Sequence, residues 1–146
     1  MLPLADVVFG TPNFDAYFTR YDHTEFRRAA SALIKEFPNL DIVISTLRAI
    51  KSASRHDFSA VCLADSQVIK ARDYVDLNVF DRVGSGDAFA AGFIYGVLRA
   101  NGAPFAVECG TAHAVLAMTT PGDNSTATLN ETAIELRTRR DPEPMF

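Results

Sequence analysis

The stretch that decides the fold reads Asp81-Arg82-Val83-Gly84-Ser85-Gly86-Asp87-Ala88-Phe89 and stands directly before a long apolar segment. Glycine adopts backbone conformations that other residues resist, so Gly84 and Gly86 can form a tight turn and let a ligand approach the backbone closely. Successive N–H groups at the start of a helix form an anion-binding concavity, to which the helix dipole adds roughly half a positive charge. The stretch is therefore suited to bind phosphate, or to stabilise the charge on a phosphoryl group in transfer.

Asp87 is the only acidic residue of the helix that we expect from Asp87 to about Ala100. This segment is apolar nearly all round, which is typical of a buried helix. A carboxylate beside an anion-binding turn can accept the proton of a hydroxyl that attacks phosphate, and a positioned base contributes about 10²–10⁴ in rate. An Asp in the first helical turn can equally serve only as a cap for orphan N–H groups. Residue chemistry alone leaves both roles open.

The rest of the chain alternates strands and helices, which indicates the α/β class. Apolar runs predict strands at 5–9, 41–45, 59–64, 67–71 and 76–80, with a hairpin around Asp65-Ser66. Helical spacing predicts helices at 22–37, 104–119 and 130–139, the first one opened by a capping-box-like pair. Thr11-Pro12-Asn13 is interpreted as a turn that opens a short helix through Tyr17, and the polar segment from Thr46 to Asp57 as a loop.

Composition limits the classes of protein that the chain can belong to. Its 146 residues are 48% hydrophobic and carry a net charge of −4, which suits one core and argues against a nucleic-acid partner. We expect one domain over 1–140 followed by a loose tail over 141–146. No apolar stretch approaches the about 20 residues of a membrane span, and the first residues do not resemble a signal peptide. Cys62 and Cys109 suit buried free thiols in the cytoplasm, without zinc-ligand spacing.

The stretch from Asp81 to Gly92 resembles the C-terminal signature of the PfkB, or ribokinase-like, sugar kinases, D-x-x-G-x-G-D-x-F-x-x-G, at all six fixed positions. Short segments elsewhere resemble 2-keto-3-deoxygluconate (KDG) kinases: Ser45-Thr46-Leu47-Arg48, Ser52-Ala53-Ser54, Ile94-Tyr95-Gly96 and Pro121-Gly122-Asp123. The resemblance implies an α/β, ribokinase-like partial Rossmann-type sheet flanked by helices, with a β-hairpin. Ala5–Gly10 matches a segment near the middle of those enzymes, which implies that the lid and the N-terminal half of the family fold are absent.

The resemblance also implies an activity: ATP-dependent phosphate transfer to a hydroxyl of a sugar or keto sugar acid, with Mg²⁺. Asp87 would be the general base, and Gly84, Ser85 and Gly86 would supply the anion hole for the transferring phosphoryl group. The implied nucleotide-binding residues are Ser45, Thr46 and Arg48 near the ATP phosphates, Asp81 ordering the loop or the Mg²⁺ region, Arg82 on a phosphate or a sugar carboxylate, and His113 at the edge of the adenine pocket. No residue is assigned as a metal ligand.

Several alternatives stay open beside this interpretation. The family motif N-x-x-E should follow Gly10, where this sequence has Thr11-Pro12-Asn13-Phe14. The chain can therefore be a nucleotide-binding or scaffold module without catalysis, or a fragment that works only with another copy or a complementary chain; exposed edges make self-association expected. Arg82, and likewise Arg48, Lys51 and Arg55, can be solvated loop residues rather than phosphate ligands, and His113 can be a satisfied core histidine.

Overall fold

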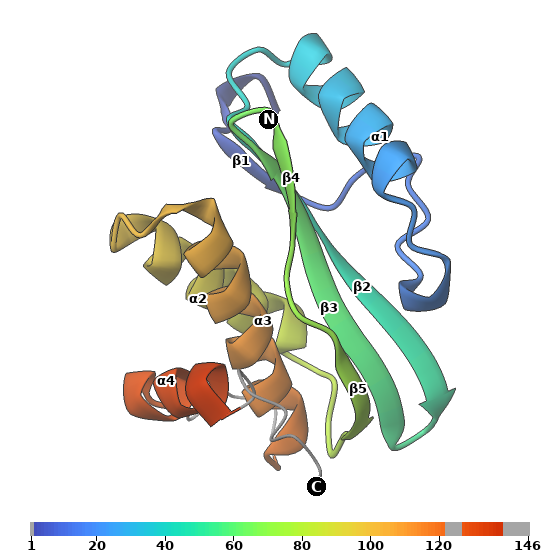
Figure 1. Cartoon of the computed structure of the whole chain (residues 1–146), viewed down its shortest axis with the longest axis vertical. Helices are drawn as coiled ribbons and strands as arrows, with labels where there is room; N and C mark the ends of the chain where they lie inside the picture. Colours follow the sequence, from blue (N-terminus) through green and yellow to red (C-terminus); the bar gives the residue numbers. More distant parts are fainter. Residues whose placement is uncertain (1, 122–126, 139–146) are drawn as a thin grey trace, which may run out of the picture. The chain divides into compact units, whose positions relative to one another are not determined.

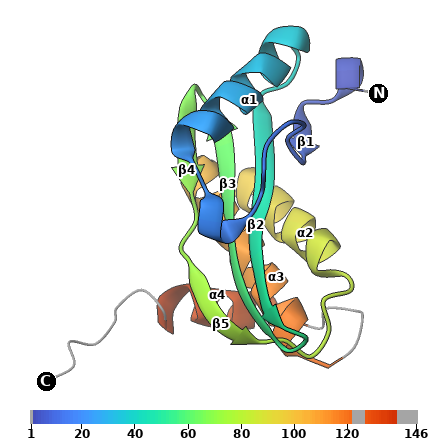
Figure 2. The same ribbon diagram turned by 90° about the vertical axis from the view of Figure 1, so that its right-hand side faces the viewer.

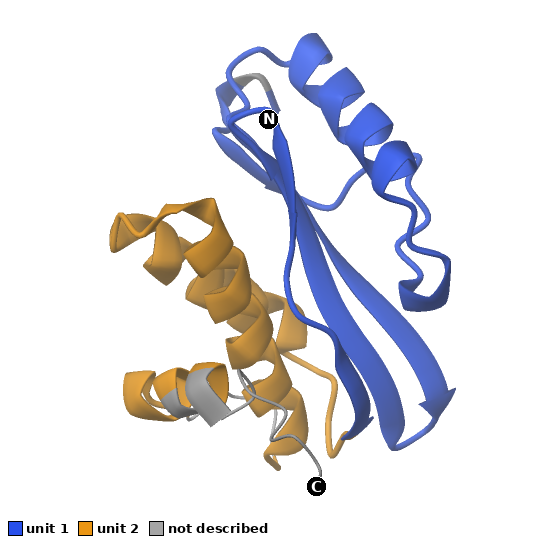
Figure 3. Cartoon of the chain, in the orientation of Figure 1, with its two compact units in different colours: residues 1–77 blue, residues 78–146 orange. Residues whose placement is uncertain are grey.

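The computed structural model describes residues 2–121 and 127–138, and the chain divides into two compact units, 1–77 and 78–146 (Figure 3). Each unit is described by itself. The single domain over 1–140 stays a prediction. The predicted tail over 141–146 and Gly122-Asp123 lie outside the described residues.

Unit 1 contains a mixed sheet whose five strands, among the described residues, are β1 (Val7–Phe9), β2 (Ile42–Ser52), β3 (Arg55–Ala64), β4 (Gln67–Lys70) and β5 (Tyr74–Asn78) (Figures 1 and 2). The strand order is β1-β2-β3-β4, and β5 pairs with β3. Strand β1 runs parallel to β2, whereas the β2–β3 and β3–β4 pairs are antiparallel. The predicted partly parallel sheet is therefore confirmed, and the last strand begins two residues earlier than expected.

The loop expected from Thr46 to Asp57 is wrong, because β2 and β3 continue through it as one long hairpin. Side chains in a strand alternate between the two faces of the sheet. Leu47 is accordingly buried, while the guanidinium of Arg48 lies 5.6 Å from the centre of the Phe58 ring. The polar residues that suggested a loop are strand residues, some exposed, such as Lys51 and Arg55, and some buried, such as His56 and Asp57.

The hairpin predicted around Asp65-Ser66 is confirmed. Both turn residues have positive φ, 49° at Asp65 and 62° at Ser66. Positive φ at both central positions is the signature of a type I′ turn, whose twist matches that of the flanking strands. This turn forms without the glycine that usually occupies it.

Helix α1 (His23–Glu36) covers one face of the unit 1 sheet (Figures 1 and 2). The backbone N–H of Glu25 donates to Asp22 Oδ1 over 2.7 Å, as the capping pair predicts. The buried side of α1 and the sheet face that it covers form one core: Phe26, Ala30, Leu33, Leu40, Val43, Leu47, Val61 and Leu63.

Two 3-10 helices also lie in the described part of unit 1. The sequence predicts a short helix through Tyr17, but Tyr17 forms a β-bridge with Arg48, and the 3-10 helix η2 (Phe18–Arg20) begins after Tyr17. A second one, η1 (Leu2–Leu4), precedes β1.

Unit 2 is helical, with α2 (Ser85–Leu98), α3 (Gly102–Thr119) and α4 (Leu129–Thr138). Helix α2 begins two residues before the expected Asp87. The backbones of α2 and α3 approach closely because small residues face each other: a Cβ on Gly92 would lie 2.7 Å from the Cys109 carbonyl oxygen. Phe89 and Phe93 are buried and stacked, with ring centres 6.2 Å apart. No helix of the described residues is both long enough and apolar enough to span a bilayer.

The packing of α2 on α3 predicts that Gly96→Ala destabilises the protein. A Cβ at Gly96 would lie 2.5 Å from the Ala106 Cα, which no rotamer change can relieve. We expect the free energy of unfolding in urea to fall by about 1–3 kcal/mol, despite the better helix propensity of alanine. The control is Gly86→Ala, whose Cβ meets nothing within 4 Å and should leave stability unchanged or raised. Equal stability of Gly96→Ala and the natural chain would contradict the packing argument.

Candidate functional site

The turn at Gly84 starts helix α2 and creates the candidate anion site in unit 2. Gly84 has φ +78° and ψ −6°, a left-handed conformation that favours glycine. An early hydrogen bond of the helix runs from the Ala88 N–H to the Gly84 carbonyl over 2.9 Å. The N–H groups of Gly86 and Asp87 lie in this first turn, where N–H groups have no intrahelical acceptor, and both residues are exposed. The turn therefore offers backbone donors to an anion beside the Asp87 carboxylate.

The loop before α2 is fixed by its own polar groups. The Ser85 hydroxyl donates to the Arg82 carbonyl over 2.8 Å, and the Val83 N–H donates to Asp81 Oδ1 over 2.9 Å. The Phe80 N–H donates to the carbonyl of Met118 near the end of α3, over 2.9 Å. The Ser85 side chain is thus buried and directed toward the loop. The backbone N–H of Ser85 also donates to the Arg82 carbonyl, over 3.3 Å. An anion here would be met first by Gly86 and Asp87.

His113 connects α3 to the first turns of α2. It forms a hydrogen bond with the backbone of Ala88. Burial lowers the pKa of His113, an effect that this hydrogen bond opposes only in part, so the imidazole is mostly neutral at pH 7. Beside it lies a largely apolar pocket of about 130 Å³, lined by residues of the three helices and of the segment before α4: Ala91, Gly92, Tyr95, Cys109, His113, Ala127, Leu129 and Thr132.

The other predicted nucleotide ligands stand on β2 in unit 1. Because side chains alternate, Ser45 points to the α1 face with Val43 and Leu47, whereas Thr46 and Arg48 point to the opposite face. Ser45 is buried, and its hydroxyl lies 2.6 Å from that of Thr11. Sequence reasoning did not select Thr11. Its place directly after the first parallel strand was the available signal, because ligands of α/β sheets bind at the carboxyl ends of such strands.

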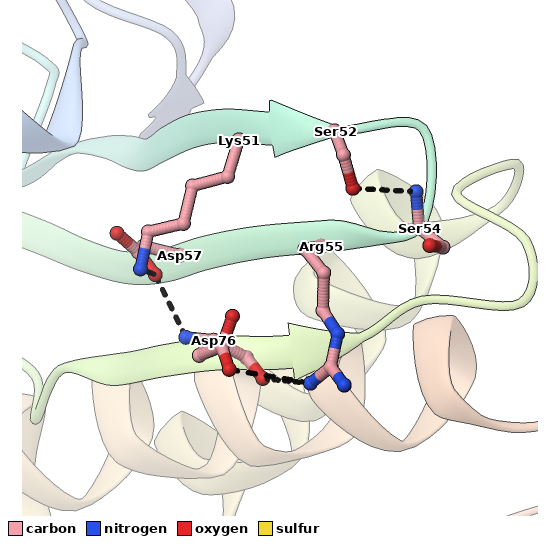
Figure 4. A network of polar contacts seen from close by, with 6 residues as sticks. All are labelled: Lys51, Ser52, Ser54, Arg55, Asp57 and Asp76. Carbon is pink, nitrogen blue, oxygen red and sulfur yellow. Dashed lines mark hydrogen bonds and ion pairs between the residues drawn. The ribbon is translucent and has the colours of Figure 1, made fainter.

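Two basic residues of the β2–β3 hairpin, Lys51 and Arg55, are paired with carboxylates of the same sheet (Figure 4). Lys51 Nζ lies 2.8 Å from Asp57 Oδ1, and Arg55 lies 3.3 Å from Asp76 Oδ2. Asp57 Oδ1 also accepts the Asp76 N–H over 2.7 Å, which holds Asp76 at its left-handed φ of 58°. These pairs favour a structural role for Lys51 and Arg55 over a phosphate clamp.

Within the described ranges, the site residues fall into two groups. Unit 2 brings together Asp81, Arg82, the turn 84–87 and His113, while Ser45, Thr46 and Arg48 share a strand of unit 1. Arg82 is exposed. Cys62 and Cys109 are buried free thiols, as predicted. Residues 2–121 and 127–138 contain no cluster of three His, Cys, Asp or Glu that could hold a metal by protein ligands alone.

Comparison with solved structures defines the fold as that of the ribokinase-like carbohydrate kinases. The 2-dehydro-3-deoxygluconokinase of Thermotoga maritima aligns with a TM-score of 0.80 and 23% identity, over 92% of this chain and 43% of that chain. A putative 2-keto-3-deoxygluconate kinase of Enterococcus faecalis aligns at 0.78 and 24%, over 99% and 44%. A putative ribokinase II of E. coli in complex with ATP and Mg²⁺ aligns at 0.68 and 20%, over 94% and 41%. The chain thus spans less than half the length of these kinases.

A family model described as pfkB family carbohydrate kinase matches residues 55–130, which include the whole Asp81–Gly92 signature. The chain belongs to the PfkB family of carbohydrate kinases. No curated protein matches the sequence.

The Asp57 network gives a pH prediction for unit 1. Burial alone would raise the pKa of Asp57, but the hydrogen bonds from Lys51 and the Asp76 N–H, with the Lys51 charge, hold it below its ordinary value. A carboxyl with a lowered folded pKa stabilises the protein above its unfolded pKa, and this contribution is lost as pH falls through the folded pKa. Asp57→Asn should therefore cost about 1–3 kcal/mol of unfolding free energy at pH 7 and less near pH 3. Urea denaturation at both pH values checks this; an equal cost at both would contradict it.

Proposed function

We propose that this chain carries the ATP side of a phosphoryl transfer to a hydroxyl of a sugar or keto sugar acid of the 2-keto-3-deoxygluconate type. One observation carries the proposal: the left-handed turn at Gly84 is followed by two exposed residues, Gly86 and Asp87, whose first-turn N–H groups lie on the same turn of α2 as the Asp87 carboxylate. Phosphoryl transfer asks mainly for positioning and charge stabilisation, which such a turn can supply. The KDG kinase structures among the similar folds support the substrate class.

Each residue of the turn has a role in this proposal. Asp87 accepts the proton of the attacking hydroxyl as general base. Gly84 shapes the turn, and the backbone of Ser85 and Gly86 completes the anion hole, with the Gly86 and Asp87 N–H groups donating to the phosphoryl oxygens. Arg82 is exposed at the same loop and offers a guanidinium for a phosphate or for the sugar carboxylate. Asp81 keeps this loop in place through the Val83 N–H.

Each unit carries candidate nucleotide ligands, which the proposal takes separately. In unit 1, Ser45 on one face of β2 and Thr46 and Arg48 on the other are candidate ligands of the ATP phosphates. In unit 2, the apolar pocket beside the neutral His113 is the candidate adenine pocket. Mg²⁺, when bound with ATP, neutralises charge on the phosphates. Magnesium in kinases is held by one or two carboxylates together with substrate phosphates, so the loop carboxylate of Asp81 suits the Mg²⁺ region without a protein-only metal cluster among the described residues.

A second candidate function is a nucleotide-binding or scaffold module that does not catalyse transfer, or that does so only with another copy or a complementary chain. One observation favours it: helix α2 exposes Ile94, Val97 and Leu98, an apolar face of the kind that proteins usually cover by association. We place the protein in the cytoplasm, where ATP is abundant and free thiols such as Cys62 and Cys109 persist.

Asp87→Asn tests the proposed base. The natural chain is mixed with ATP, Mg²⁺ and a panel of sugar acids, and ADP release is followed. We expect Asp87→Asn to lower kcat by about 10²–10⁴ while an ATP-induced rise in Tm is kept. Asp65→Asn is the matched control, because it removes a carboxylate from a turn where asparagine tolerates the positive φ.

The outcomes of this assay separate the candidate functions. Turnover that survives Asp87→Asn would contradict the general base. A Tm rise with ATP but no turnover in the natural chain would favour the binding module. No response to ATP would overturn the nucleotide site altogether. Gel filtration of the same samples tests association, and a monomer at all concentrations would contradict it.

A further inference from the structure

The hydroxyls of Thr11 and Ser45 form a polar pair just beyond the point where the parallel pairing of β1 with β2 ends, at Phe9 and Ile44. Their oxygens lie 2.6 Å apart although the residues are 34 positions apart in sequence. Ser45 is buried and Thr11 is half-buried. A main-chain hydrogen bond joins the residues that precede the pair. Gly10, at φ +105°, donates its N–H to the Ile44 carbonyl over 2.7 Å. The backbone therefore fixes where the two hydroxyls meet.

Such a pair has a defined hydrogen-bonding capacity. Each hydroxyl carries one hydrogen and two acceptor lone pairs. Whichever hydroxyl donates within the pair, one O–H hydrogen is left over for an outside acceptor. A lone serine rotates among its rotamers, whereas the hydrogen bond to β-branched, rotationally restricted Thr11 selects one. The pair is therefore a pre-oriented single donor at the edge of the sheet where α/β folds bind their ligands.

We propose that Thr11 is a positioning residue: its hydroxyl donates to the Ser45 oxygen, which leaves the Ser45 hydrogen for a phosphate oxygen of the nucleotide. The inference rests on the proposed function, in which Ser45 meets the ATP phosphates. Thr11 needs no contact with the nucleotide: its effect passes through the 2.6 Å hydrogen bond. The donor that Thr11 orients is a neutral hydroxyl. It therefore selects a phosphate oxygen by its position and adds no charge to the sheet.

The test is a double-mutant cycle with the full chain and MgATP, measured by titration calorimetry. Thr11→Val keeps the shape of the side chain and removes the hydroxyl, and Ser45→Ala removes its partner. Each should raise the Kd for MgATP about 3- to 10-fold, and the double variant should be no weaker than Ser45→Ala alone. Thr11→Ser keeps the hydroxyl and should stay within about 2-fold of the natural chain. Urea denaturation of every variant provides the stability readout.

Each result has a distinct meaning. Loss of stability with unchanged affinity in Thr11→Val would show a structural role alone and overturn the inference, as would additive losses in the double variant. If Thr11→Val does not fold, Thr11→Ala and Thr11→Ser are compared in its place. Failure of the natural chain to bind MgATP would overturn the proposed nucleotide site and this inference with it. Binding by the natural chain that Thr11 variants share equally would overturn the inference only.

Discussion

The left-handed turn at Gly84 is the constraint on which unit 2 depends. A residue with a Cβ is strained at φ +78°, so glycine is what allows the loop to enter α2 without cost. The helix that starts there packs closely on α3. A Cβ on Gly92 of α2 or on Gly110 of α3 would lie less than 3 Å from a backbone oxygen of the other helix. The glycines of the signature thus do two different jobs: Gly84 turns the chain, and Gly92 brings two helices together.

This construction makes the proposed phosphate site compatible with a net charge of −4. The donors of the turn are backbone N–H groups, whose partial charge does not enter the formal charge. The formal charges of Lys51 and Arg55 are matched by Asp57 and Asp76 within the sheet. The acidic balance of the sequence therefore argues against nucleic acid, whose recognition needs clustered cations, but not against a single phosphoryl group.

Local signals in the sequence predicted local structure well. The Asp22 cap, the hairpin at Asp65-Ser66 and the helix after Gly84 each depend on neighbouring residues, and all three are present. The sequence predicts a loop over 46–57 because the charged residues of this segment interrupt the alternation of apolar and polar side chains that indicates a strand. Contacts between residues far apart in the chain could not be predicted from the sequence. The residues around Thr11 do not indicate its hydrogen bond with Ser45, and those around Asp57 do not indicate its hydrogen bond with Asp76. The same alternation separates Ser45 from Thr46, which adjacency in sequence had grouped together.

Membership of the PfkB family does not by itself make this chain a kinase, because nucleotide binding and turnover depend on different parts of such a site. In the proposed function, affinity for ATP depends on features such as the Gly84 turn. Turnover requires in addition that the acceptor hydroxyl be held in line, and holding two reactants together is worth about 7–11 kcal/mol of the barrier. In the proposed function, a fully formed turn with Asp87 in place therefore transfers little phosphate unless the sugar is held beside it. The acceptor site, rather than the phosphate site, decides between the two candidate functions.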